Sequence, residues 1–135
     1  MTTALWPLQE AVYAKLTGNA PFMALVKGKG LFDEVPEKAA HPYVSFGSAT
    51  EVVDDAHNQR GLTVNLVLHI WSKYPGVKEA AAILAALDNV LDRQPLVVAG
   101  FRDVSVAHQQ HQHVRDPDPT IRHINVTYRV WLTKE

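Results

Sequence analysis

Cysteine is absent from the 135-residue sequence, and so are any long apolar run and any excess of charge of one sign. The lack of cysteine excludes disulfide bonds and thiolate metal sites, and it fits a reducing compartment. Because nowhere do about 20 apolar residues follow one another, no membrane-spanning helix is predicted. The N-terminal sequence MTTALWPLQEAVYAKL has no basic start and no long apolar core, so we expect a soluble protein that is not exported.

The charged residues are balanced and dispersed, with 13 lysines and arginines against 14 aspartates and glutamates. No basic stripe forms that could neutralise a run of phosphates, so direct nucleic-acid binding is not expected. The sequence also lacks a glycine-rich phosphate loop, a nucleophile elbow and an HExxH helix, which mark common enzyme classes. We therefore predict neither an enzyme nor a cofactor.

Apolar residues recur at helical spacing in three parts of the chain. Leu8, Val12 and Leu16 follow one another at four-residue intervals, which is typical of a first helix. A shorter helical piece restarts at Asn19, whose side chain is a favourable N-cap. The clearest stripe of apolar residues runs through residues 76–94 and predicts the main helix of the chain.

Alternation of apolar and polar residues predicts about five strands. We expect them at residues 31–32, at 43–53 and 61–71 as a hairpin with its tip at 54–61, from Phe101 onward, and at 121–132. Strict alternation and short connections indicate a mainly antiparallel sheet with two to three helices packed on one face. The predicted fold class is therefore α+β, a two-layer sandwich. Length and apolar content predict one domain over residues 1–135.

The most unusual stretch is 108-HQQHQHVRDPDP-119, with three histidines in six residues. Strict alternation places His108, Gln110 and Gln112 on one face of the strand. Gln109, His111 and His113 then lie on the other face. Because neither face is apolar between Ala107 and Val114, residues 108–122 are predicted to form a polar hairpin arm that projects beyond the sheet. A hairpin that is polar on both faces is marginal alone, so we expect a partner to order it.

A metal site is the main alternative to an assembly arm. If residue 113 lies opposite residue 123, then His111, His113 and His123 share one face, as three ligands do in catalytic zinc sites. A register slip of one residue would separate them, and a projecting arm lacks the dry, concave surroundings of a catalytic zinc. The alternative function is thus a small metal-dependent enzyme or metal-binding module. Otherwise no metal is predicted.

Several segments together resemble a known family. They are 8-LQEAVYAKL-16, 33-DEVPEKAAHPYVSFG-47, 66-LVLHIWS-72, 96-LVVAG-100 and 115-RDPD-118, with His123 and Arg129. In this order, over nearly the whole chain, they resemble the tail-completion, or tail-terminator, proteins of long-tailed bacteriophages and gene transfer agents. The chain departs from the family at Pro119, where glycine commonly follows the Arg-Asp-Pro-Asp turn. Proline cannot adopt the positive φ that glycine allows.

The resemblance implies a structural virion subunit with no catalytic residues. It implies a ring, typically a hexamer, on the head-proximal end of the tail tube, which stops tube polymerisation and offers a docking surface for head–tail joining. The implied partners are other copies of the chain, the tail-tube protein and the head connector or neck protein, with no membrane involved. DNA would only pass through the lumen, and a near-neutral charge suits a pore in which DNA slides. The protein is thus expected at the tail–head junction of the virion, and in the host cytoplasm during assembly.

Two polar segments are the expected assembly contacts. Their residues are His111, His113, Arg115, Asp116 and Asp118 in one arm, and Asp54, Asp55, His57 and Arg60 in the other. The aspartate pairs could bind a hard cation, but in turns such side chains more commonly cap the local backbone. Trp71 and Trp131 lie off the apolar face, and they either add to these contacts or pack together or under a helix.

Overall fold

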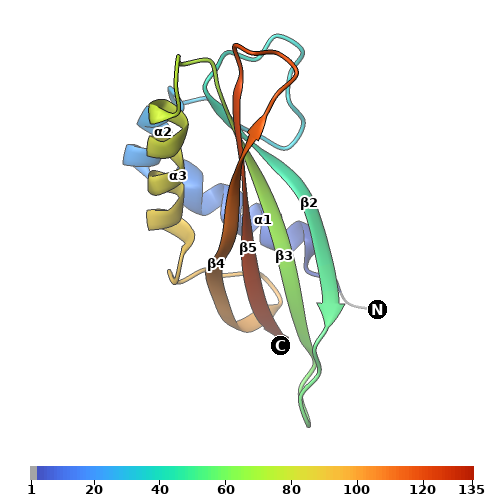
Figure 1. Ribbon diagram of the computed structural model, residues 1–135. Helices are drawn as coiled ribbons and strands as arrows, with labels where there is room; N and C mark the ends of the chain where they lie inside the picture. Colours follow the sequence, from blue (N-terminus) through green and yellow to red (C-terminus); the bar gives the residue numbers. More distant parts are fainter. Residues whose placement is uncertain (1–2) are drawn as a thin grey trace.

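A computed structural model describes residues 3–135, which form a five-stranded sheet and three helices (Figure 1). In chain order the elements are α1 (Leu5–Thr17), α2 (Ala20–Leu25), β1 (Leu31–Phe32), β2 (Tyr43–Val53), β3 (Gly61–Ser72), α3 (Lys78–Leu91), β4 (Phe101–Arg115) and β5 (Arg122–Lys134). The predicted helices, the first hairpin and the last two strands all form. The α+β fold class is therefore confirmed.

The two N-terminal helices follow from apolar spacing and from one cap. Leu8, Val12 and Leu16 are buried along α1, as their four-residue spacing requires. The Asn19 side chain accepts a hydrogen bond from the N–H of Phe22 at 2.9 Å and so caps α2. The cap fixes the start of α2, and Phe22 in the first turn of this helix is buried in the core.

The helix α3 is the main element packed on the sheet. Its buried residues lie on one stripe: Ala80, Ile83, Leu87, Val90 and Leu91. The Ser72 hydroxyl donates to the Glu79 carboxylate at 2.7 Å, which ties the end of β3 to the first turn of α3. The helix thus begins at the point where β3 leaves the sheet.

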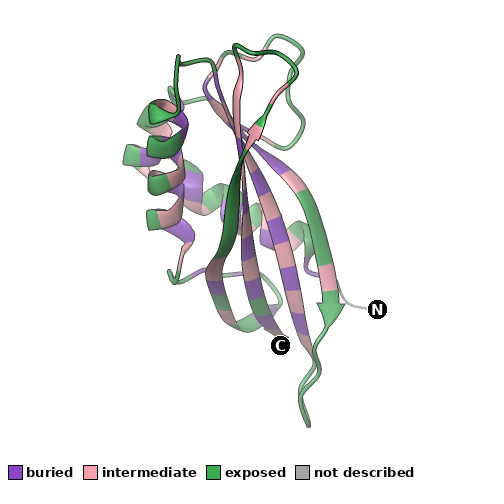
Figure 2. Cartoon of the chain, in the orientation of Figure 1, coloured by how far each residue is buried: buried purple, intermediate pink, exposed green. Residues whose placement is uncertain are grey.

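The strand order in the sheet is β1-β2-β3-β5-β4. β1 runs parallel to β2, and the other three pairs are antiparallel, so the mainly antiparallel sheet is confirmed. β3 and β5 alternate between buried and half-buried residues, whereas the half of β4 next to its turn is exposed (Figure 2). β4 is therefore an edge strand with little cover.

The helices cover only one face of the sheet (Figure 1). On that face the even-numbered residues of β3 and β5 are buried, and Leu68, Ile70 and Tyr128 are among the largest side chains with almost no exposure. We call the opposite side the outer face; it consists of the odd-numbered residues 63–71 of β3 and 123–133 of β5. Within residues 3–135, no helix lies over it.

The polar arm predicted over residues 108–122 does not project beyond the sheet. β5 pairs with β3 as far as Ser72 opposite Arg122, and β4 pairs with β5 as far as Arg115 opposite Arg122. Only the turn at residues 116–121 extends past the paired strands. The segment is polar on both sides because it is an edge strand at the margin of the helical layer, not because it leaves the sheet.

Two bulges interrupt β4, between Arg102 and Ser105 and between His108 and Gln110. The second inserts one extra residue, Gln109, so alternation restarts with the opposite parity. His111 consequently faces the helical side together with His108, and the predicted division of the two faces is wrong. A bulge has no signal in the alternation of polar residues, which explains the error.

Candidate assembly surface

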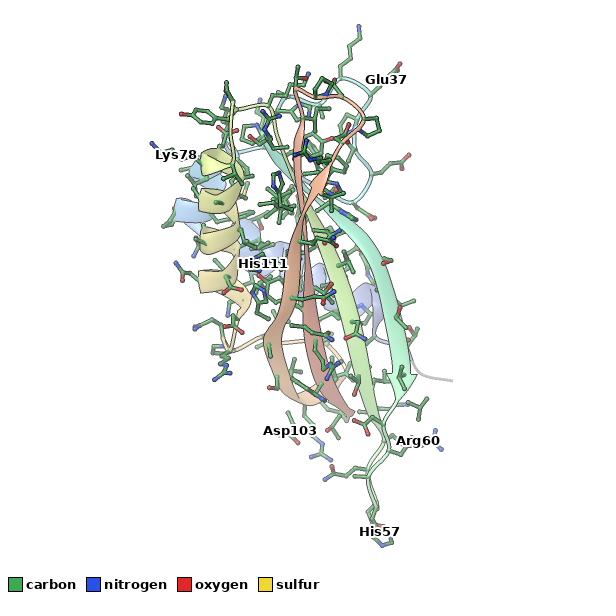
Figure 3. The ribbon with its side chains drawn as sticks, viewed as in Figure 1. Glu37, His57, Arg60, Lys78, Asp103 and His111 are labelled. Atoms are coloured by element: carbon green, nitrogen blue, oxygen red, sulfur yellow. The ribbon has the colours of Figure 1, made fainter. Side chains whose placement is uncertain are left out.

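The two segments predicted as assembly contacts lie apart from each other on the sheet. Figure 3 shows His57 and Arg60 at the tip of the β2–β3 hairpin, with His111 near the middle of the molecule. The β4–β5 turn, at residues 116–121, lies at the other end (Figure 1). The structure therefore does not bring the two sets together within one chain.

The β2–β3 tip is held by its two aspartates. The Asp54 carboxylate accepts a hydrogen bond from the Thr63 hydroxyl at 3.0 Å, and the Asp55 carboxylate accepts one from the N–H of Gly61 at 3.1 Å. Both carboxylates thus cap the local chain, as aspartate commonly does in turns. His57 and Arg60 remain exposed at the tip.

The β4–β5 turn is closed by aspartate side chains as well. The Asp116 carboxylate accepts from the N–H of Asp118, and the Asp118 carboxylate accepts from both the N–H and the hydroxyl of Thr120. These bonds to Thr120 lower the pKa of Asp118. No residue of the turn needs a positive φ, so Pro119 fits where the resembled family has glycine.

A recess of about 430 Å³ lies beside this turn. Its lining includes His113, Arg115, Asp116 and Arg122. Arg115 and Arg122 are direct cross-strand partners, an arrangement that is unfavourable for two like charges. The recess therefore presents two guanidinium groups and one imidazole beside a single carboxylate.

On the helical side, four residues form a hydrogen-bonded chain between α3 and the strands β4 and β5. The Asp88 carboxylate accepts from the buried Tyr128 hydroxyl at 3.0 Å and contacts Nδ1 of His108 at 2.6 Å. A neutral His108 then carries its proton on Nδ1, so its Nε2 accepts from Nδ1 of His111 at 3.0 Å. Burial, followed by the Asp88 carboxylate, raises the pKa of Tyr128 above its usual range.

The three histidines of the proposed metal site are separated. The pairing sets Val114, not His113, opposite His123, because Gln109 shifts the register by one residue. His123 therefore lies on the outer face, whereas His111 and His113 lie on the helical side. The register required for the metal alternative is wrong, and within residues 3–135 no cluster of three or more histidine, aspartate or glutamate side chains could hold a metal ion.

His123 belongs instead to an aromatic cluster on the outer face. Its ring stacks on Trp71 with centroids 3.8 Å apart and planes inclined by 9°. Its Nε2 lies 2.8 Å from Nδ1 of His69, so one nitrogen donates a proton and the other accepts it. Tyr43 extends the cluster from β2, with its ring 6.3 Å from that of Trp71. We call Tyr43, His69, Trp71 and His123 the outer-face cluster.

Burial of the outer-face cluster lowers the pKa values of its two imidazoles. The pKa of His69 is lowered by burial, and the pKa of His123 is lowered by burial and then by the neighbouring His69. The pKa of His41, whose ring lies 4.9 Å from that of Tyr43, is lowered by burial and then by the positive charge of Lys73. Burial also raises the pKa of Tyr43.

The other end of the outer face carries Trp131 and an incompletely bonded polar pair. The Arg129 guanidinium lies 5.9 Å from the centre of the Trp131 ring. Nε of Arg129 and Oδ1 of its register partner Asn65 are both buried, and neither has a hydrogen-bond partner among residues 3–135. Trp71 stacks on His123 and Trp131 lies beside Arg129, so the two tryptophans pack neither together nor under a helix.

The sequence left several of these residues unassigned. Asp88 and Tyr128 looked like ordinary helix and strand residues, and the pairing of His69 with His123 depends on the register between β3 and β5. The sequence indicated only that His69 and His123 each fall on the polar face of their strand. The alternation of faces alone cannot show which residues of two strands lie opposite each other.

These features define a class of protein, a small α+β subunit whose distinctive groups lie on turns, an edge strand and an uncovered sheet face. In the part of the chain that the structure describes, no helix is long and apolar enough to cross a membrane. The family model for "Tail completion protein gp17" matches residues 10–133. The chain belongs to this tail completion family, as the motifs of the sequence indicate.

Two solved structures are similar to the chain. A chain from the virion of a native gene transfer agent particle is 26% identical, with a TM-score of 0.90, and the match covers 98% of this chain and 99% of that one. The gp17 protein of bacteriophage SPP1 is 21% identical, with a TM-score of 0.57 over 95% of this chain and 88% of that one, and it shows the fold alone. No curated protein matches the chain. Family membership makes the chain a structural tail completion component of the virion.

Proposed function

We propose that the protein forms a ring, a hexamer, on the head-proximal end of the tail tube. There it ends tube polymerisation and provides the surface on which the head joins the tail. Its partners are further copies of itself, the tail-tube protein and the head connector or neck protein. It acts as a single non-enzymatic domain over residues 1–135, and DNA passes through the lumen without being bound in a sequence-specific way.

The observation that carries this proposal is the match to a chain of a gene transfer agent virion at a TM-score of 0.90 over 98% of this chain. The match covers nearly the whole of both chains, so the similarity extends over the whole described fold and not over one part of it. The charge balance supports passage of DNA, because 13 basic residues are offset by 14 acidic ones and do not form a stripe that would retain phosphates.

The two ends of the sheet are proposed as the contacts with neighbouring particle components. The exposed residues His57 and Arg60 serve at one end, with Asp54 and Asp55 shaping that tip. At the other end, Arg115 contributes charge beside the recess, with His111, His113, Asp116 and Asp118 on the adjoining strand and turn. Sites at opposite ends suit a subunit placed between two different structures.

Particles made without this chain test the function. Electron microscopy of such lysates is expected to show filled heads apart from tails, and tail tubes of abnormal length. Supplying the wild-type chain in trans should restore joined particles with tubes of normal length. Joined, infectious particles in the absence of the chain would refute the proposal.

A matched pair of substitutions tests the contacts. Arg60→Ala and Arg115→Ala each remove one exposed charge at one end of the sheet, so each should leave the fold intact, with a stability change within about 0.5 kcal/mol. Each is expected to reduce joined particles, whereas Glu10→Ala, at an exposed position of α1 in the helical layer between the two ends, should not. Equal yields from all three variants would remove these residues from the contact surface.

A further inference from the structure

The free edge of β4 is covered over only part of its length. The N–H of Arg93 donates to the carbonyl of Val106 at 2.8 Å, and the N–H of His108 donates to the Asp92 carboxylate at 2.8 Å. Backbone groups of Val106 and His108 therefore point away from β5, toward the segment that follows α3. Beyond His108, no other strand of residues 3–135 borders β4 on this side.

The open part of the edge exposes the backbone of two histidines. In a strand, residues whose side chains share a face also direct their N–H and C=O groups to the same side. His111 and His113 lie opposite Val126 and Ile124, on the same face as His108. Their backbone groups consequently point outward, away from β5, where a further strand would pair.

The side chains along this edge lack the features that keep edge strands from pairing with other chains. Natural edge strands are protected by lysine, by other charges, by proline or by bulges. From Val104 to Val114 there is no lysine, arginine, aspartate, glutamate or proline, and after the bulge at Gln109 the register with β5 is regular to Arg115. Glutamine and histidine side chains keep the edge hydrated and carry none of the permanent charges that would repel another strand.

The opposite edge of the same sheet is open as well. β1 pairs only with Val44 and Ser45, so residues 48–53 of β2 lie beyond it. Val52 and Val53 in this stretch are 55% and 67% exposed, and the stretch contains no lysine or proline. Its one charged side chain, Glu51, accepts hydrogen bonds from the Thr3 hydroxyl and the N–H of Ala4 ahead of α1, on the helical side of the sheet. Each copy of the chain therefore presents one open polar edge and one open edge with exposed valines.

The directions of the strands make these two edges compatible. β2 is antiparallel to β3, β3 to β5 and β5 to β4, so β4 runs antiparallel to β2. A neighbouring copy related by a rotation about an axis roughly along the strands keeps the same strand directions. The register sets Ala49 level with His108 and Tyr43 level with Val114 across the sheet, so the strands must also be inclined to the axis, as they are in barrels, for the two open stretches to meet. The β2 strand of that neighbour then meets β4 of the first copy in an antiparallel ladder. Because the two edges differ, the contact is head-to-tail, and it closes a ring when the rotation returns to the first copy.

We propose that residues 110–114 of β4 in one copy pair with residues 49–53 of β2 in the next, so that the sheets of neighbouring subunits are continuous. This inference rests on the proposed ring and names the surfaces that form it. Pairing between two β4 edges around a two-fold axis would instead close a dimer and stop there.

Proline substitution at the outward-facing amides tests the pairing. The double variant His111→Pro/His113→Pro removes two outward N–H groups, and proline is tolerated at edge positions whose N–H faces solvent. The control His111→Val/His113→Val removes the same imidazoles but keeps both N–H groups. Rings would be counted by electron microscopy on isolated tail tubes over a series of protein concentrations, with thermal unfolding used to check the fold.

We expect the proline variant to need about ten-fold more protein than the valine variant to cap half of the tubes, since only the proline variant loses two ladder hydrogen bonds. The valine variant, compared with wild type, measures what the two imidazoles themselves contribute to contacts with other chains. Equal capping by the folded proline and valine variants would overturn the edge pairing and leave the ring proposal standing. Absence of rings with the wild-type protein would defeat the ring itself, so the two failures are distinguishable.

Amide hydrogen exchange of the wild-type chain provides a second measurement if the proline variant does not fold. In assembled rings the amides of His111 and His113, together with those of Ala49 and Val53, should exchange at least about ten-fold more slowly than in the free chain. Protection of the β4 amides without the β2 amides would refute the pairing of β4 with β2. Unchanged exchange at all four positions would refute any pairing at these edges.

Discussion

At the scale of single residues, Gly47 decides how the outer-face cluster packs. A Cβ atom at this position would lie 2.5 Å from Nε2 of His69, closer than any ordinary contact. The hydrogen of glycine leaves room for the imidazole of His69, which then reaches His123 on the adjacent strand β5. The motif 33-DEVPEKAAHPYVSFG-47 thus ends in a glycine for a steric reason that its sequence alone does not reveal.

Replacing Gly47 with alanine should therefore displace His69 and break its contact with His123. Overpacking of this kind costs about 1–3 kcal/mol of unfolding free energy, measured by urea denaturation. The imidazole resonances of His69 and His123 should move in NMR spectra. Ser48→Ala, at the exposed neighbouring position, is the control and should change the stability by less than about 0.5 kcal/mol. An alanine variant with wild-type stability and unmoved imidazole signals would show that the ring has room to shift.

At the scale of elements, periodicity predicted which segments are helices and strands, but not how β4 is paired. The stripe through Ile83 and Leu87 and the alternation in β3 both arise from burial, which the side-chain types record. The bulge at Gln109 lies in a stretch whose residues are polar on both faces of the strand, so the pattern of apolar residues does not change where the bulge occurs. For this reason the faces of His111 and His113, and with them the metal alternative, could not be settled from sequence.

Asp88 makes polar contacts between α3 and the sheet. Its carboxylate accepts a hydrogen bond from the Tyr128 hydroxyl on β5 and contacts the imidazole of His108 on β4. Asp88→Asn keeps the shape but removes the charge that strengthens both hydrogen bonds, and Tyr128→Phe removes one donor. Each change should lower the unfolding free energy by about 1–2 kcal/mol in urea denaturation.

A double-mutant cycle separates this contact from other effects of the two substitutions. The double variant Asp88→Asn/Tyr128→Phe should be more stable than the sum of the single changes predicts, by about 0.5–1 kcal/mol. Such a difference is the coupling energy of the two side chains. Strict additivity would mean that the hydrogen bond does not contribute to holding α3 on the sheet.

At the scale of the whole molecule, the fold leaves one sheet face and parts of both sheet edges uncovered by other elements of residues 3–135. The resemblance in sequence and the family model agree on a tail completion protein, because the order of motifs reflects the order of elements. The surfaces that would join subunits have no comparable signal. Edge pairing uses backbone groups, which every sequence contains, so only the strand order shows which of them are open.

The half-buried histidines at one end of the molecule make its stability depend on pH. The pKa values of His41, His69 and His123 are all lowered from 6.5, chiefly by burial. Between the folded pKa and 6.5 the unfolded chain binds more protons than the folded one, so the unfolding free energy decreases as the pH falls. The stabilisation is complete above the unfolded value and is lost as the pH falls through 6.5 toward the folded pKa.

Thermal unfolding should therefore give a lower midpoint at about pH 5.5 than at about pH 7.5. His123→Gln keeps a hydrogen-bonding group beside His69 but cannot be protonated, so it should reduce this difference. His57→Gln, at the exposed hairpin tip far from the cluster, should leave the difference as in the wild type. If the two variants depend on pH equally, the His69–His123 contact is not the source of the acid sensitivity, because only one of them removes a proton-binding group from the outer-face cluster.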